Sequence, residues 1–132
     1  ALGLAQLERV EELVDRKREI NTLYRSLLSK NSQIKVTSEL EECKSIHWMT
    51  SIELIGASFD DRAIFMTQLK DHLIDTRPVF SPLSSLPMFK TKKANCIAYR
   101  IGASAVNLPS GHNIKQHEIE YICEVINNIT CK

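Results

Sequence analysis

The first 29 residues carry apolar side chains at helical spacing. The apolar positions are Leu7, Val10, Val14, Tyr24, Leu27 and Leu28. Residues three or four apart lie on the same face of an α-helix, so this spacing predicts one amphipathic helix from Ala1 to about Ser29. Charged residues between Glu11 and Glu19 occupy the other face, where we expect them to be solvated rather than to bind a ligand.

The pattern changes to strand alternation between Ile46 and Ile55. One face of the predicted strand carries Ile46, Trp48, Thr50, Ile52 and Leu54. Alternate side chains of a strand point to opposite faces, so we expect Trp48 in the core and His47 toward solvent, where it can also reach a ligand. Residues 30–45 are polar around a short Ile34-Lys35-Val36 segment and are predicted to form a connecting loop.

The remaining chain alternates short helices and strands. Ser58 precedes two aspartates and is placed to cap a helix that runs to His72. The apolar contacts of that helix are Ala63, Phe65, Met66 and Leu69. Beyond it we predict a strand at 75–79, a helix at about 94–104, a strand at 105–108, and a last helix from about Asn113 with the apolar stripe Ile119, Ile122, Cys123, Ile126 and Ile129. This order predicts an α+β fold, with helices covering a small, mostly antiparallel sheet.

The stretch from Asp75 to Phe89 contains three of the four prolines of the chain. Proline lacks an amide donor and disfavours the helical conformation in the residue before it, so we expect an ordered, non-helical loop after the strand. We expect the loop to be anchored by burial of Phe80, Leu83, Leu86, Met88 and Phe89. Arg77 and the serines would then be available for polar contacts, which makes this loop the predicted working surface.

The composition indicates one small globular domain over residues 1–132, made of a leading helix at 1–29 and a sheet-and-helix body at 30–132. The chain has 43% hydrophobic residues and a formal net charge of +1, from 17 basic and 16 acidic side chains. This balance gives no electrostatic reason to expect nucleic acid or an anionic membrane as a partner. No apolar run approaches the roughly 20 residues of a membrane span, and no signal peptide opens the chain, which indicates a cytoplasmic protein.

The four cysteines, at positions 43, 96, 123 and 131, form no CxxC pair and no zinc-like spacing with the histidines. We expect reduced thiols rather than a disulfide framework. The basic run Lys90-Thr91-Lys92-Lys93 is expected to be a solvated surface, although such a run can also meet a phosphate.

Four segments of the sequence resemble the DegT-type sugar aminotransferases. They are Ala1 to Val10, Trp48-Met49-Thr50-Ser51-Ile52, Thr76-Arg77-Pro78-Val79-Phe80-Ser81-Pro82-Leu83 with Pro87-Met88-Phe89, and Asn107-Leu108-Pro109-Ser110-Gly111. They occur in the order and at the spacing of the family and span nearly the whole chain. Within the family, the sequence resembles the perosamine-synthase-like enzymes.

The resemblance implies the small C-terminal domain of a pyridoxal phosphate (PLP) enzyme of fold type I. Such an enzyme transfers an amino group from glutamate to a nucleotide-linked 4-keto sugar, and is typically a homodimer. Its central chemistry needs a lysine that forms a Schiff base with PLP, and in the family this lysine lies in the large domain. The 17 basic residues here include none in that lysine motif, and no capping residue precedes Ala1. We therefore expect that the large domain has been removed, that this chain alone carries no cofactor, and that it is inactive.

The resemblance also indicates site residues in the proline-rich loop. Arg77 is the strongest candidate for a substrate or domain-closure contact, because a guanidinium offers several fixed donors; an ordinary ion pair is the alternative. Phe80 and Ser84 are the other candidates. The family usually has a histidine at the position of Ser84, an aromatic residue at that of Ser81, and a Thr or Ser cap at that of Lys115.

A competing hypothesis is a non-catalytic interaction or dimerisation domain derived from such an enzyme. It rests on the apolar surface that the first helix is expected to expose once the large domain is absent.

Overall fold

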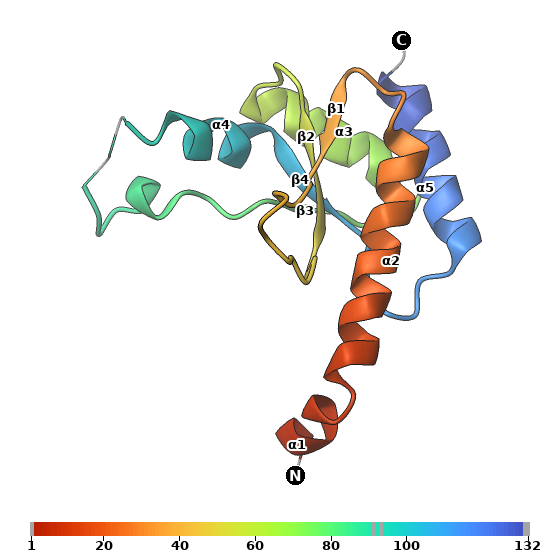
Figure 1. Cartoon of the computed structure of the whole chain (residues 1–132). Helices are drawn as coiled ribbons and strands as arrows, with labels where there is room; N and C mark the ends of the chain where they lie inside the picture. The colour runs from red at the N-terminus through yellow and green to blue at the C-terminus, as the bar shows by residue number, and fades with distance from the viewer. Residues whose placement is uncertain (1, 91, 93, 131–132) are drawn as a thin grey trace.

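The computed structural model describes residues 2–90, 92 and 94–130 (Figure 1). Its helices are α1 (Leu2–Leu7), α2 (Val10–Leu28), α3 (Phe59–Asp71), α4 (Cys96–Ser104) and α5 (Gln116–Thr130), with a short 3-10 helix η1 (Leu83–Ser85). Its strands are β1 (Ile34–Val36), β2 (Thr50–Leu54), β3 (Arg77–Pro78) and β4 (Ala105–Leu108). The predicted α+β class is confirmed.

The four strands form one antiparallel sheet in the order β1-β2-β4-β3. Ile52 lies opposite Val106 in the register between β2 and β4. Both side chains are fully buried, so this central pair lies at the middle of the core. Arg77 lies opposite Asn107 at the edge of the sheet, which places two polar residues side by side.

The core lies between the sheet and the helices α2, α3 and α5, and α5 contacts both α2 and α3. Its largest fully buried apolar side chains are Tyr24, Ile20, Leu28, Ile52, Leu69, Ile119, Ile126 and Val106. These residues come from helices and strands whose apolar positions repeat at the expected periods, so burial within this chain accounts for the body of the fold.

The predicted single helix at the N-terminus is wrong in one respect, because it is divided in two. α1 ends at Leu7 and α2 starts at Val10, with a non-helical backbone at Arg9. Leu7 and Val10 are exposed, so no core contact straightens the junction. Leu27 is also partly exposed, and the face of α2 that is buried carries Ile20, Asn21, Tyr24 and Leu28. Figure 1 shows α1 at the far end of α2 from the sheet.

Four predictions for residues 30–55 are also wrong. Ile34–Val36 is a strand and not part of a loop, since Ile34 is buried and pairs with Leu54. The second strand starts only at Thr50, because His47 has a φ of 45° and interrupts the alternation. Trp48 is therefore 59% exposed instead of lying in the core, and His47 is buried instead of facing solvent.

The predictions for the helix after Ser58 are confirmed by its cap. The Ser58 hydroxyl accepts a hydrogen bond from the Asp61 amide (3.2 Å), and the Asp61 carboxylate accepts one from the Ser58 amide (2.8 Å). Phe65 and Leu69 are buried as expected, whereas Ala63 is exposed.

The elements near the C-terminus also follow the prediction. The helix at 94–104 and the strand at 105–108 are confirmed as α4 and β4. The last helix starts at Gln116 instead of near Asn113, and the Lys115 amide donates to the Glu118 carboxylate (2.7 Å) at its first turn. The predicted stripe of α5 is confirmed, since Ile119, Ile122, Cys123 and Ile126 are buried and Ile129 is half-buried.

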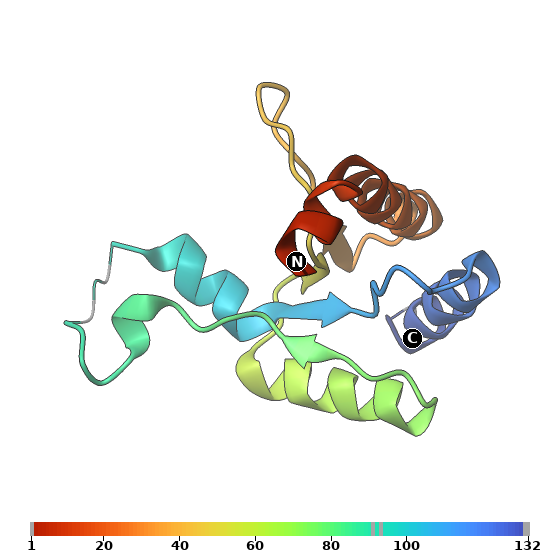
Figure 2. The ribbon, with the colours of Figure 1, turned by 90° about the horizontal axis from the view of Figure 1, so that it is seen from below.

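Residues 80–90 and 94–104 form an arm that projects away from the body, on the side opposite α2 and α5 (Figures 1 and 2). The predicted strand before the arm is reduced to Arg77–Pro78, followed by one further bond from the Val79 amide to Ala105 (3.2 Å). The expected anchoring by burial is wrong, because Phe80, Leu83, Met88 and Phe89 are 53–73% exposed and Leu86 is only half-buried. The loop also contains one helical turn, η1, contrary to the prediction. These apolar side chains therefore lie at the surface of the arm and not in the core.

Three further expectations are answered by the described part of the chain. Cys43, Cys96 and Cys123 have free thiols, while Cys131 lies outside the described residues. Lys90 and Lys92 are exposed, and Thr91 and Lys93 of the same basic run lie outside them too. No helix among residues 2–90, 92 and 94–130 is long and apolar enough to cross a membrane.

Candidate functional site

A hollow of about 260 Å³ lies where three segments that are distant in the sequence meet. The segments are Trp48-Met49, the edge of the sheet at Asp75 and Arg77, and residues 107–111. Lys17 of α2 also lines the hollow. The fold therefore brings three of the four motif segments of the sequence to one place.

Arg77 lies at this hollow on the short edge strand β3. Its Nη2 is 3.0 Å from the Asp75 Oδ2, so the ion pair considered as the alternative is present. Both side chains are 75% exposed, and an ion pair in water contributes only about 0–1 kcal/mol to stability. The remaining guanidinium donors of Arg77 stay available to a ligand.

Lys17 reaches the same hollow from α2. Its Nζ donates a hydrogen bond to the backbone carbonyl of Ser110 (2.5 Å). Partial burial lowers the pKa of Lys17, because removing an ammonium from water disfavours the charged form. A negative charge in the hollow would favour the charged form again.

A neighbouring hollow of about 370 Å³ shares Trp48, Met49 and Asn107 with the first as lining residues. The second hollow is lined by residues of the loop before β2, together with Phe80 at the base of the arm. The Trp48 and Phe80 rings are stacked, with centroids 6.2 Å apart and an angle of 14° between the planes. Two aromatic rings that are both exposed therefore form one continuous surface beside the cationic groups.

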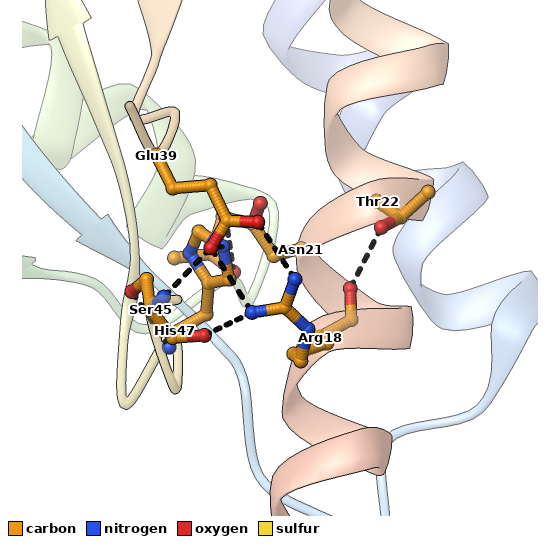
Figure 3. Close-up of polar contacts among 7 residues, drawn as sticks. Arg18, Asn21, Thr22, Glu39, Ser45 and His47 are labelled. Carbon is orange, nitrogen blue, oxygen red and sulfur yellow. Dashed lines mark hydrogen bonds and ion pairs between the residues drawn. The ribbon is translucent and has the colours of Figure 1, made fainter. Parts of the chain in front are cut away.

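A polar network ties the loop that presents Trp48 to α2 (Figure 3). Arg18 binds the Glu39 carboxylate with two hydrogen bonds of 2.7 and 3.0 Å, and it also donates to the Ser45 carbonyl. The Ser45 amide donates to the Glu39 Oε2 (2.6 Å). The Arg18 hydrogen bonds, and then the Ser45 amide, lower the pKa of Glu39 to about 2, so this carboxylate stays ionised.

His47 lies against the same network. Its Nε2 is 3.9 Å from the Glu39 Oε2. Burial lowers the pKa of His47 and outweighs the neighbouring carboxylate, which acts in the opposite direction. The imidazole is therefore held neutral, and its left-handed backbone turns the chain so that the next residue, Trp48, faces outward.

α2 holds the opposite wall of the hollow as well. The Tyr24 hydroxyl donates to the Pro109 carbonyl (2.8 Å), and burial raises the pKa of this phenol, which keeps it protonated. Arg16 donates to the His112 carbonyl (3.3 Å). One helix thus positions both the loop that carries Trp48 and the loop that follows β4.

The three predicted site residues are not brought together in one place. Arg77 lines the first hollow and Phe80 the second. Ser84 lies on the arm, where its hydroxyl is 3.0 Å from the Tyr99 hydroxyl. Lys17 was not among the predicted site residues, and Trp48 was expected in the core. Trp48 and Asn107 both lie in segments that resemble the family, whereas Lys17 has no sequence signal beyond its position in a charged helix.

A larger hollow of about 690 Å³ lies between the end of α3 and α5. His72, His117 and Glu118 are among its lining residues. In the described part of the chain, however, no three His, Cys, Asp or Glu side chains are grouped so that they could hold a metal ion. We place the candidate site at the smaller hollow, because the motif segments and the two cations meet there.

Comparison with known proteins decides the family. The model of the DegT/DnrJ/EryC1/StrS aminotransferase family matches residues 1–127. The chain belongs to this family.

Members of the family with similar sequences include two GDP-perosamine synthases. The enzyme from Escherichia coli O157:H7 is 38% identical over 128 residues, which are 96% of this chain and 34% of the relative. The enzyme from Vibrio cholerae is 34% identical over 131 residues, which are 97% of this chain and 35% of the relative. The chain spans about a third of the length of the curated relatives that it matches.

Solved structures of the family have the same fold. Spr1654 from Streptococcus pneumoniae, in its PMP form, matches with a TM-score of 0.86 at 25% identity, covering 98% of this chain and 33% of that one. DesI, solved in the presence of its TDP-sugar product, matches with a TM-score of 0.83 at 23% identity, covering 98% and 34%.

The family is PLP-dependent, but the hollow does not have the groups that a PLP site needs. The lysine that lines the hollow is Lys17, and its Nζ donates a hydrogen bond to the backbone carbonyl of Ser110. The carboxylate of the hollow is Asp75, and that group is paired with Arg77 instead of being free for a pyridine nitrogen. These residues fit the part of a site that recognises charge, and not the part that holds the cofactor.

Proposed function

We propose that this chain is the small C-terminal domain of a PLP-dependent aminotransferase that acts on a nucleotide-linked 4-keto sugar, as perosamine synthases do. The observation that carries the proposal is the meeting of three family motif segments at one hollow lined by Arg77 and Lys17. The GDP-perosamine synthases among its relatives support a nucleotide-sugar substrate.

In the proposed parent enzyme, the remaining two thirds supply the Schiff-base lysine and PLP, which provides the electron sink for amino transfer. This chain then contributes substrate contacts and closure of the site. Arg77 meets an anionic part of the substrate, Phe80 packs beside it with Trp48, and Ser84 on the arm meets the sugar or the large domain. On this proposal the chain alone binds no PLP covalently and is inactive. A homodimeric assembly and a cytoplasmic location belong to the same proposal and rest on the family resemblance.

A second candidate, a non-catalytic interaction or dimerisation domain, is favoured by one observation. Leu2, Leu4 and Leu7 of α1 are all more than 60% exposed, and Figure 1 shows this helix standing clear of the body. Apolar side chains gathered in this way commonly mark a protein contact. Reading the coding sequence upstream of Ala1 distinguishes the two candidates, because a lysine-bearing large domain in the same frame supports the enzyme.

The test of the proposed function is Arg77→Ala in a reconstructed parent enzyme, made by joining this chain to the N-terminal two thirds of the Escherichia coli GDP-perosamine synthase. If Arg77 contacts the substrate or completes closure, kcat/KM for amino transfer falls about 10- to 100-fold, or about 1.4–2.7 kcal/mol, with folding nearly intact. Melting temperature and amino-transfer kinetics are measured on the same variant.

Arg25→Ala serves as the matched control, because Arg25 is an exposed arginine of α2 that lines a separate hollow with Thr22 and Ser26. The control should keep both stability and kinetics. Unchanged kinetics in Arg77→Ala, with or without a lower melting temperature, would remove Arg77 from the site.

A further inference from the structure

Arg62 of α3 is a buried cation without a counter-ion. It is only 6% exposed, and among the described residues it pairs with no carboxylate. Its Nε is buried and donates to no acceptor in the same part of the chain. Burying a guanidinium in this way costs free energy that an apolar side chain of similar length would not. Such a group is more typical of a functional contact than of core packing.

Two contacts hold the guanidinium of Arg62. Its Nη1 donates to the Gly102 carbonyl (2.6 Å), and its Cζ lies 4.6 Å from the centroid of the Phe59 ring. Gly102 lies in the last turn of α4, where the final four carbonyls of a helix have no partner within the helix and form the negative end of its dipole. Arg62 therefore caps α4 from a different helix.

The capped end of α4 is also where the two halves of the arm meet. Gly102 lies so close to Pro82 that a Cβ there would be 2.8 Å from the Pro82 Cδ, and it would be 3.9 Å from the Phe80 carbonyl oxygen. Tyr99 lies one turn earlier on α4, and its hydroxyl is 3.0 Å from that of Ser84. The position of α4 therefore determines where Phe80 and Ser84 lie.

Phe80 connects the base of the arm to the candidate site. Its ring is stacked on Trp48, and it lines the second hollow. Arg62 itself lines neither of the two hollows. Any effect of Arg62 on the site is therefore transmitted through α4 and Phe80.

We propose that Arg62 is a positioning residue for amino transfer: from the body it fixes α4, and through α4 it sets the positions of Phe80 and Ser84. The inference deepens the proposed function and rests on it for the catalytic consequence. The effect on the arm is a property of this chain alone. Arg62 acts through the arm and not by touching the substrate.

Arg62→Met is the first test, because methionine keeps an unbranched side chain but removes the charge and all the donors. Replacing a buried cation that has no counter-ion by an apolar side chain should leave the melting temperature of the 132-residue chain unchanged or raise it. Amide hydrogen exchange in α4 should nevertheless become about tenfold faster, with β2 and α5 unchanged. Acrylamide should quench Trp48, the single tryptophan of the sequence, more strongly, because Phe80 is no longer held against it.

Two further variants are matched to this test. Arg62→Lys keeps the charge and a donor, so it should restore the exchange of α4 to within about threefold of that in the original chain. Ser58→Ala removes the N-cap of the same helix without touching α4. It should lower the melting temperature but leave both α4 exchange and Trp48 quenching unchanged. Arg62→Gln, with a shorter and neutral side chain, takes the place of Arg62→Met if that variant does not fold.

The catalytic consequence is measured in the reconstructed parent enzyme. There kcat/KM for amino transfer should fall about tenfold in Arg62→Met and recover to within about threefold in Arg62→Lys, while Ser58→Ala keeps it. A loss of the same size in Ser58→Ala would contradict the inference, because it would follow stability and not the position of the arm.

Three other results would overturn the inference. They are unchanged α4 exchange and Trp48 quenching in Arg62→Met, exchange that rises equally throughout the body, and an active parent enzyme whose kcat/KM does not change in Arg62→Met. A parent enzyme that is inactive with Arg62 in place refutes the proposed function instead. The measurements on the chain alone then still decide whether Arg62 holds the arm.

Discussion

The body and the arm of this domain use apolar residues in opposite ways. In the body, Leu69 of α3 is fully buried between helices and sheet. In the arm, Leu83 of η1 is 71% exposed, although the two residues are chemically the same. The buried hydrophobic core therefore comes from the body, which also exposes residues such as Phe59 and Ile64 of α3, whereas no hydrophobic residue of the described part of the arm is buried.

The arm is nevertheless held in a defined position by a few contacts. Ser84 bonds Tyr99 across it, Arg100 pairs with Glu53 of β2, and buried Arg62 of α3 donates to the Gly102 carbonyl (2.6 Å). Exposed apolar residues on a positioned segment are typical of a surface that another part of a protein covers. This matches a chain that spans a third of the length of its relatives.

The largest expected effect comes from making one substitution in both regions. Leu69→Ala removes a fully buried side chain and should lower the free energy of unfolding by about 2–5 kcal/mol. Leu83→Ala removes an exposed side chain and should change the free energy of unfolding by less than about 0.5 kcal/mol. Urea denaturation of both variants measures the difference, and equal losses would show that the arm is part of the core.

A smaller effect is expected where the arm folds back on itself. A Cβ at Gly102 of α4 would lie 2.8 Å from the Cδ of Pro82, so Gly102→Ala should push the loop at Pro82 away from α4. We expect this to destabilise the packing of the arm by about 1–3 kcal/mol. The better helix propensity of alanine offsets up to about 1 kcal/mol of that cost. Gly3→Ala, whose Cβ would meet nothing within 4 Å, is the control. Limited proteolysis within residues 82–99 should become faster only in Gly102→Ala, and equal rates would contradict the close packing.

The smallest effect concerns the network that positions Trp48. His47 has a folded pKa below its ordinary value of 6.5, so the unfolded chain takes up a proton first as the pH falls. The stability that neutral His47 contributes is fully present above pH 6.5 and is lost as the pH falls from 6.5 through its lowered folded pKa. The stability that ionised Glu39 contributes is lost only at lower pH, between 4.5 and about 2. His47→Asn, which tolerates the positive φ, should flatten the melting-temperature profile between pH 7 and 5. His72→Gln, at an exposed histidine, should leave the profile unchanged; a profile that stays steep in His47→Asn would assign the pH dependence to another group.

The body could be predicted from the sequence because its elements follow periodic patterns that end in burial. The stripe of α5 and the cap at Ser58 are examples, since each depends only on nearby residues. β1 was missed because three residues are too few to show a period, and its burial depends on pairing with β2.

The site was less predictable, because its parts come from separate elements. Arg77 and Phe80 were selected by the motif and do lie at the two hollows, but Lys17 arrives only through the packing of α2. Trp48 was misplaced because the left-handed turn at His47 cannot be inferred from alternation. The apolar residues of the arm were wrongly expected to be buried within this chain. An apolar side chain indicates that a residue tends to be buried, but not which part of a protein covers it.

Hydrogen exchange in the arm tests most directly whether this domain is completed by a larger enzyme. The amides of residues 83–89 and 96–101 are followed in the chain alone and in the reconstructed parent enzyme. We predict fast exchange of residues 83–89 in the chain alone and marked protection in the parent, with the body equally protected in both. Equal exchange of the arm in the two proteins would contradict the account, because the exposed side chains would then have no partner in the enzyme.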